Sequence, residues 1–284
     1  MKDSEAALLF IFMACAYAVN YPLIKFALGM EPPMVVLFYR VSFALVSSIP
    51  FIAMNLRKFP TGLRDNLLVL LVSMFNIVGF MGLWFTGESM ASAHLSSILV
   101  YTYPIFNVLF SVIFVGEKAS AGTVAGMAIG FAGVILVAFS NLSFTGYLGI
   151  FLLVSAAISW TCGTVIFKRT VPHVDVRTVN ALQYVYSVPV ILVLALATGG
   201  SPVYGISLEF VGIGAYLGLV GTYLPYLVYL ILFRNYNVTR ISPFFFIIPA
   251  ISIAFSVLFL HETIGLLTVA GFGIISLGIF LSNR

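Results

Sequence analysis

Long apolar runs, separated by short stretches that contain charged residues, glycine or proline, make up nearly the whole chain. An α-helix rises about 1.5 Å per residue, so crossing a hydrocarbon core of about 30 Å takes roughly 20 apolar residues. The connections between the runs are short, which leaves no room for an extramembrane domain. The pattern predicts ten membrane-spanning helices, at residues 6–28, 34–54, 66–86, 92–115, 121–140, 146–167, 178–197, 209–232, 238–260 and 264–282.

The composition also indicates an integral membrane protein. Hydrophobic residues make up 62% of the 284 residues, charged residues make up 8%, and the mean hydropathy is +1.15. Soluble domains typically carry about a quarter charged residues, so we expect an all-α integral membrane protein with the lipid bilayer as its surroundings. The net charge of +4 is scattered over short loops, so no nucleic-acid partner is expected.

The positions of the basic residues predict the orientation. If the N-terminus lies inside, all Lys and Arg residues except Lys25 and Arg40 fall on the inner side. Such an excess is typical of the cytoplasmic face of a membrane protein. The first apolar run is too long for a signal peptide and is read as a retained span. We therefore expect a multi-pass protein of the cell membrane with both termini in the cytoplasm.

The two halves of the chain repeat one another. Residues 110–117 read FSVIFVGE and residues 255–262 read FSVLFLHE, 145 positions later. A nearly constant shift also aligns Lys25 with Lys168, Arg40 with Gln183 and Pro104 with Pro249. The predicted units are residues 1–142 and 143–284, each with five spans, so the second unit must be inverted in the membrane. Inverted repeats are typical of transporters that work by alternating access.

Several stretches resemble the drug/metabolite transporter superfamily, in its EamA-type ten-helix branch. They are SSILVYTYPIFNVLFSVIFVGEK at 96–118, ISPFFFIIPAISIAFSVLFLHET at 241–263, WTCGTVIFK at 160–168, and Arg40 in the second span. The resemblance implies a basket in which spans 1, 3, 4, 6, 8 and 9 surround a central cavity, and traffic of small metabolites, often amino-acid efflux. Tyr17 stands where a tryptophan is usual, and His261 replaces a glycine, so the substrate stays open.

No catalytic signature is present. A Walker A motif is absent, which argues against ATP-driven pumping and favours a secondary transporter without a cofactor. His94, His173 and His261 are far apart and lack the spacing of metal ligands, so neither a metal site nor an enzyme is expected.

Pro104 and Pro249 fall near the middle of the fourth and ninth spans. A proline inside a helix removes a hydrogen bond and clashes with the carbonyl four residues earlier, which kinks the helix. The kinks can serve packing alone, or they can form hinges between the part of the span that lines the cavity and the part that closes it. We take the hinge as the working hypothesis.

Four charged residues are candidates for a gate or an ion pair: Lys25, Arg40, Glu117 and Glu262. Lys25 and Arg40 lie toward the outer face, where Glu88 and Glu262 are also expected. Each base is expected to pair with a carboxylate or, as the second interpretation, to bind the carboxylate of a substrate. Arg40 can also reach outward to water. Glu117 and Glu262 end equivalent helices on opposite sides of the membrane, where a gating or packing role is favoured over proton coupling.

Polar and aromatic residues inside the spans predict the cavity. Each alone is more often a helix–helix contact than a ligand, but together they predict a mostly apolar cavity with scattered hydrogen-bonding groups. The predicted cavity residues are Tyr17, Asn20, Asn76, Tyr101, Trp160, Tyr223, Tyr226 and Phe246.

Such a cavity suits a small-molecule substrate, and the predicted function is the export of small metabolites such as amino acids. The alternative is a multidrug or toxic-compound exporter of the same fold. It would need an acid at cavity depth, whereas no Asp or Glu lies mid-span and the nearest, Glu88, sits near a span end. A monomer is the expected state, with oligomers left open.

Overall fold

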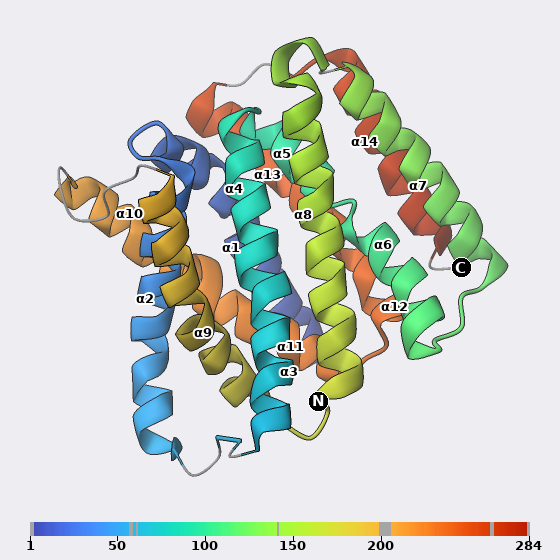
Figure 1. The fold of residues 1–284 in the computed structure, drawn as a ribbon. Helices are drawn as coiled ribbons and strands as arrows, with labels where there is room; N and C mark the ends of the chain where they lie inside the picture. The colour runs from blue at the N-terminus through green and yellow to red at the C-terminus, as the bar shows by residue number, and fades with distance from the viewer. Residues whose placement is uncertain are drawn as a thin grey trace.

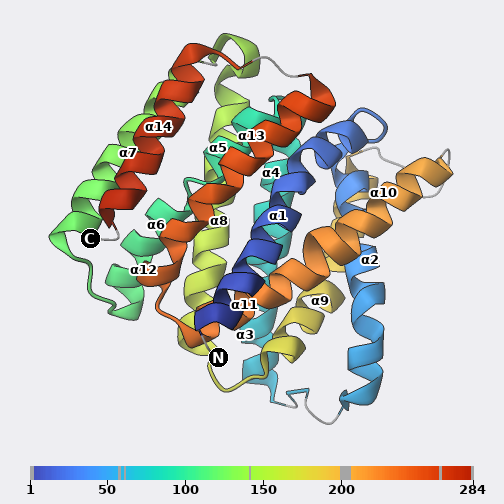
Figure 2. The same ribbon diagram turned by 180° about the vertical axis from the view of Figure 1, so that it is seen from behind.

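A computed structural model describes residues 3–56, 59–60, 62–140, 142–198, 206–261 and 264–282. Within these ranges the protein is built from helices, which Figures 1 and 2 show from opposite sides. The helices of the first half are α1 (Asp3–Leu28), α2 (Pro33–Met54), α3 (Leu63–Ser73), η2 (Met74–Gly79), α4 (Phe80–Ser89), α5 (Ala93–Val100), α6 (Tyr103–Phe110), η3 (Ser111–Val115) and α7 (Ala121–Ser140). Those of the second half are α8 (Leu142–Thr170), α9 (Val176–Ala197), α10 (Leu208–Gly218), η4 (Leu219–Tyr223), α11 (Leu224–Asn235), α12 (Val238–Ile241), η5 (Ser242–Phe246), α13 (Ile247–Leu260) and α14 (Leu266–Ser282).

Each predicted span corresponds to one helix or to a run of consecutive helices. Among the described residues, 8 stretches are long and apolar enough to cross a membrane, and two shorter apolar helices occur at Ala121–Gly133 and Leu266–Gly278, within α7 and α14. Large apolar side chains on the outside, such as Leu8, Ile11 and Val46, are exposed, as expected of a surface that faces lipid. The predicted all-α membrane fold with ten spans in two inverted repeats is confirmed.

The third span of each half changes helix type at matching positions. In the first half, α3 passes into the π-helical η2 before α4, and in the second half α10 passes into the π-helical η4 before α11. Wider π turns inside α-helices occur frequently at functional sites, because they redirect side chains and loosen the regular hydrogen bonding. The two π segments therefore mark equivalent irregular points in the inverted repeats.

The fourth span of each half is interrupted just before its proline. Tyr101 and Thr102 form a turn between α5 and α6, and Pro104 is the second residue of α6, where its missing N–H is not needed. In the second half, the 3₁₀ segment η5 precedes α13, in which Pro249 is the third residue. The predicted kink is thus a turn between two helices in the first half, and a change from 3₁₀ to α-helical geometry without a break in the second half.

The two repeats are interleaved rather than packed as separate bodies. Helix α2 packs against α9 and α10, α4 against α8, and α1 against α11 and α13, so the main contacts of each half are made with the other half. Figure 1 shows α8 running alongside the centre of the bundle, with helices of the first half on either side. The centre of the bundle is therefore an interface between the repeats.

Helices α7 and α14, the last spans of the two repeats, form a close pair at one side of the bundle (Figures 1 and 2). A Cβ added to Gly133 would lie 2.7 Å from the carbonyl oxygen of Gly271, and one added to Gly278 would lie 2.4 Å from that of Gly126. Gly126 aligns with Gly271 and Gly133 with Gly278, so the two contacts are equivalent and antiparallel. Small residues let membrane helices approach this closely.

Candidate functional site

Four aromatic rings form a stacked column at the centre of the bundle. Trp84 stacks on Phe80 with centroids 5.4 Å apart, and Phe80 stacks on Trp160 at 4.5 Å. On its other side Trp160 stacks on Tyr103 at 4.0 Å. The rings come from the third, sixth and fourth spans and are almost wholly buried, so the column joins both repeats. Apart from Trp160, its members were not among the predicted cavity residues.

The predicted cavity residues Tyr17 and Tyr101 border this column. Their rings meet Trp160 edge-on, with centroids 6.2 and 6.1 Å away. Tyr226 is also buried, with its ring 5.1 Å from that of Tyr229, whereas Tyr223 is half-buried and its carbonyl accepts a hydrogen bond from Asn180 Nδ2 at 3.2 Å. Phe246 lies in η5, and its side chain is outside the described part of the structure.

Polar atoms gather around the column. The hydroxyls of Tyr103 and Tyr226 and the indole N–H of Trp160 lie close to one another and to the hydroxyl of Tyr229. The hydroxyl of Tyr17 is buried at the edge of the column without a hydrogen-bond partner among the described residues. Buried polar groups of native proteins are usually satisfied, so this hydroxyl stands out among its neighbours.

Two asparagines each pack against a glycine of the other repeat, and the repeat relates the two contacts to each other. Asn20 Nδ2 donates to the carbonyl oxygen of Gly221 at 2.9 Å, and a Cβ on Gly221 would lie 2.3 Å from Asn20 Oδ1. In the equivalent contact, a Cβ on Gly163 would lie 2.0 Å from Asn76 Oδ1. Asn20 aligns with Gly163, and Asn76 with Gly221, so each repeat supplies one asparagine and one glycine. Both asparagines therefore serve as interhelical contacts in this conformation.

Arg40 is fully buried and holds the second span against the π segment of the eighth. Its Nε donates to Thr222 Oγ1 at 2.5 Å, and its Nη2 donates to the carbonyl oxygen of Gly221 at 3.0 Å. The guanidinium carbon also lies 5.2 Å from the ring centroid of Trp84 and 5.4 Å from that of Phe85, within the range of a cation–π interaction. Arg40 therefore stands at one end of the aromatic column.

Lys25 and Lys168, the aligned basic residues of the first and sixth spans, bind carbonyl oxygens where a neighbouring helix ends. Lys25 Nζ donates to the carbonyls of Glu88, at 3.0 Å, and Ala91. Lys168 Nζ donates to those of Phe233 and Tyr236, both at 2.7 Å. A cation is favourable at a helix C-terminus, where the last carbonyls lack partners within the helix. In the structure both lysines thus cap the third span of their own repeat.

Glu117 crosses from one repeat to the other. Its Oε1 accepts from Val238 N at 3.0 Å and its Oε2 from Thr239 N at 2.9 Å, at the start of α12. The chain can turn there because Gly116 adopts a left-handed conformation with φ +80° that ends η3. Glu117, at the end of the fourth span, therefore fixes the start of the ninth span by two hydrogen bonds. The equivalent acid, Glu262, lies outside the described residues.

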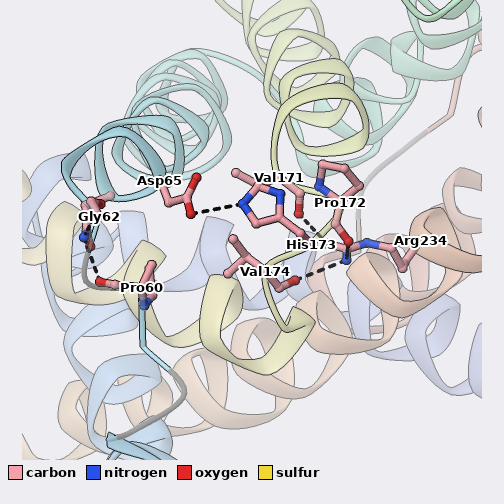
Figure 3. A network of polar contacts seen from close by, with 9 residues as sticks. Pro60, Gly62, Asp65, Val171, Pro172, His173, Val174 and Arg234 are labelled. Carbon is pink, nitrogen blue, oxygen red and sulfur yellow. Dashed lines mark hydrogen bonds and ion pairs between the residues drawn. The ribbon is translucent and has the colours of Figure 1, made fainter.

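The loop between α8 and α9 closes the same end of the bundle, as Figure 3 shows. Arg234 donates from Nη2 to the carbonyl of Val171 at 3.0 Å and from Nη1 to those of Val174, at 3.1 Å, and Pro172. His173 Nε2 lies 3.0 Å from Asp65 Oδ2 in the first turn of α3. These contacts join both third spans to the loop, and the sequence pattern had not singled them out as a group.

The interlocking glycines could have been found from the sequence, because the repeat shift places each opposite an asparagine. The column could not. Phe80 and Trp84 look like ordinary apolar positions, and Tyr103 is one of several span tyrosines in a chain that has 27 Phe and 14 Tyr. Which ring faces the centre depends on the rotation of each helix about its axis. Only the packed structure shows that rotation.

A ten-span helical fold with inverted repeats and a polar, aromatic interface between them is that of a multi-pass membrane transporter rather than an enzyme. The sequence model of the EamA-like transporter family matches residues 4–139 and again residues 147–284, and the chain belongs to this family.

Similar proteins include the "Uncharacterized transporter YvbV" of Bacillus subtilis (strain 168), which is 30% identical over 100% of this chain and 93% of its own length. The "Probable amino-acid metabolite efflux pump" of Escherichia coli (strain K12) is 25% identical over 99% of this chain and 94% of its own. A solved crystal structure has the same fold, with a TM-score of 0.76 and 17% identity over 98% of this chain and 96% of that one.

Proposed function

We propose that the protein is a secondary transporter of the cell membrane that exports small metabolites such as amino acids. The observation that carries the proposal is the mirrored interlock at the centre of the bundle, Asn20 on Gly221 and Asn76 on Gly163, between two inverted halves. Such an arrangement lets one half rock against the other about a midplane site. The efflux activity in the name of the Escherichia coli relative supports the class of substrate.

The proposal assigns the gate on one side to Glu117. Its two hydrogen bonds join the end of the fourth span to the start of the ninth, and so close the inner end of the central interface. Opening toward the cytoplasm would break this cap. The turn before Pro104 and the 3₁₀ segment before Pro249 would let the two parts of each span turn independently. By the repeat, Glu262 is the corresponding acid at the outer end. Both termini lie in the cytoplasm in this arrangement.

The buried guanidinium of Arg40 favours export of metabolites over export of toxic cations. Two unit charges 4 Å apart repel by about 4 kcal/mol at an effective dielectric constant of 20, so a cation beside Arg40 would be strongly disfavoured. The buried carboxylate of Glu88, which accepts a hydrogen bond from Trp84 Nε1 and interacts with Arg40, places a negative charge beside this positive one. One charge of each sign at the end of the column suits a zwitterion better than a lone cation.

Transport in liposomes tests the function. The purified protein is reconstituted, and uptake of a panel of labelled amino acids is measured with and without a pH gradient, with protein-free liposomes as the control. Flux of at least one amino acid above the control is expected. Flux that does not respond to the gradient identifies a facilitator, and no flux of any amino acid contradicts the proposed substrate class.

A further inference from the structure

The outward face of α3 carries a hollow that the central site does not use. It has a volume of about 790 Å³ and is lined by leucines, with Arg64 near one end and Met74 at the other. Leu63, Leu67 and Leu71 recur at every fourth position and are 75%, 53% and 42% exposed, so they form one open stripe along the helix. This feature, which we call the α3 hollow, is therefore apolar along its length and charged near one end.

The α3 hollow is about as long as one leaflet of a bilayer is thick. The helical run from Arg64 to Met74 corresponds to about 15 Å at a rise of 1.5 Å per residue. A hydrocarbon core of about 30 Å has leaflets of about 15 Å. When Arg64 lies at the level of the lipid headgroups, Met74, the first residue of the π segment η2, therefore lies near the midplane.

The charged end of the α3 hollow is positive. Arg64 is exposed, and the acid next to it is engaged with another residue, because Asp65 points toward His173, whose Nε2 lies 3.0 Å from Asp65 Oδ2 (Figure 3). The connection that leads to α3, residues 55–62, contains Arg57 and Lys58 and no acid. Basic residues next to a span attract anionic lipid headgroups. The charge and the apolar stripe thus match the two parts of an anionic phospholipid.

The second repeat lacks this combination. Its corresponding helix, α10, begins with Leu208 and Glu209, so an acid stands near its start, and it carries Gly212 and Gly214 in its middle. The leucine stripe and the arginine of α3 are therefore not a requirement of the shared fold. They call for an explanation of their own.

We propose that the α3 hollow binds an anionic phospholipid, with one acyl chain along the leucines and the phosphate on the guanidinium of Arg64. The planar guanidinium matches the geometry of a phosphate and binds it by charge-assisted hydrogen bonds. The end of the acyl chain would lie beside Met74, so the lipid contacts the third span where its helix type changes. This role is separate from transport and does not depend on which solute the protein carries.

Lipid binding by the purified full-length protein in detergent tests the proposal, by native mass spectrometry and thermal unfolding. The probes are dioleoylphosphatidylglycerol, which is anionic, and dioleoylphosphatidylcholine, which has the same chains and no net charge. Inorganic phosphate tests whether the anion alone is sufficient. Dihexanoylphosphatidylglycerol tests whether the headgroup is sufficient without long chains.

Two variants change the two parts of the site separately. Arg64→Gln removes the charge, and Leu67→Trp fills the hollow with a side chain that still suits a surface facing lipid. Arg240→Gln is the matched control for the charge, because Arg240 is exposed on α12. Val46→Trp is the matched control for the added bulk, because Val46 is exposed on α2.

Dioleoylphosphatidylglycerol is expected to raise the unfolding temperature of the wild type more than dioleoylphosphatidylcholine does, and inorganic phosphate is not expected to raise it. Arg64→Gln should bind the anionic lipid about fivefold more weakly, the factor that corresponds to about 1 kcal/mol for one basic residue at an anionic membrane surface. Leu67→Trp should weaken binding by a similar factor although the charge is intact. Both control variants should bind as the wild type does.

The proposal is overturned if the two long-chain lipids act equally on the wild type, or if inorganic phosphate or the short-chain lipid acts as well as the long-chain one. It is also overturned if Arg64→Gln or Leu67→Trp binds as the wild type does. Dimers that Leu67→Trp disrupts would show that a second copy of the chain, and not a lipid, covers the hollow. Should Arg64→Gln fail to fold, Leu67→Trp and the comparison of the two lipids decide the question.

Discussion

Asn20 and Gly221 touch across the two repeats so closely that no larger residue fits: Asn20 Nδ2 donates to the Gly221 carbonyl at 2.9 Å, and a Cβ on Gly221 would lie 2.3 Å from Asn20 Oδ1. The partners are 201 residues apart in the chain. The same pairing recurs in inverted order between Asn76 and Gly163. A contact made twice in opposite senses lies at the proposed pivot between the two inverted halves.

Gly221→Ala is therefore expected to destabilise the protein by about 1–3 kcal/mol, the usual cost of overpacking a buried contact. Thermal unfolding in detergent measures the loss. Gly212→Ala on α10 is the control, because an added Cβ there meets nothing within 4 Å. In the double variant with Asn20→Ala, part of the loss from Gly221→Ala should be recovered, since the clashing oxygen is gone. Strictly additive losses would show that the two residues are not coupled.

If Glu117 forms the proposed gate, Glu117→Gln is expected to loosen it, because an amide replaces only one of the two carboxylate oxygens that accept from Val238 N and Thr239 N. Loss of a helix cap typically costs about 1 kcal/mol. A cysteine placed at the buried Ser242, after removal of Cys15 and Cys162, should react several-fold faster with a maleimide in Glu117→Gln than with Glu117 intact.

Asp175→Asn is the matched control for the gate. Asp175 caps α9 by accepting from Arg177 N at 2.9 Å and from Thr178 N at 3.3 Å, so its loss also removes a cap at the same side of the membrane. It should leave the labelling rate at position 242 unchanged. Equal acceleration by both variants would mean that Glu117 merely stabilises a helix end.

Gly278→Ala is expected to separate α7 from α14. The added Cβ would lie 2.4 Å from both the carbonyl oxygen of Gly126 and the amide nitrogen of Gly130, and the backbone there cannot yield as a side chain can. Gly273→Ala in the same helix meets nothing within 4 Å and should be tolerated. The unfolding temperatures of the two variants are compared, and that of Gly278→Ala should be the lower. Equal unfolding temperatures would contradict the close pairing of α7 and α14.

Arg234→Gln is expected to destabilise the closed end of the bundle far more than His173→Gln. Arg234 donates to three loop carbonyls and covers the Phe167 ring at 4.8 Å, so its loss removes three hydrogen bonds and a cation–π contact at once. The ion pair of His173 with Asp65 is partly exposed, and exposed pairs contribute between 0 and about 1 kcal/mol. Unfolding temperatures of the two variants provide the comparison, and the reverse order would show that the ion pair organises the loop.

The sequence by itself determined the ten spans and their inversion. Each span shows as a long apolar run, because lipid excludes charged residues and unpaired backbone from the hydrocarbon core. The repeat shows because the matched residues include charges, prolines and glycines as well as apolar positions. An odd number of spans in each unit then leaves only an inverted arrangement.

The tertiary structure alone decided which side chains meet. Helices that are apolar all round carry no stripe to say which face is buried, so the rotation of each span is invisible in the pattern of its residues. The column through Trp84, Phe80 and Trp160, the cap that Glu117 places on the ninth span, and the carbonyls bound by Lys25 all depend on that rotation. They join segments far apart in the chain, and only the packing of the two repeats brings them together.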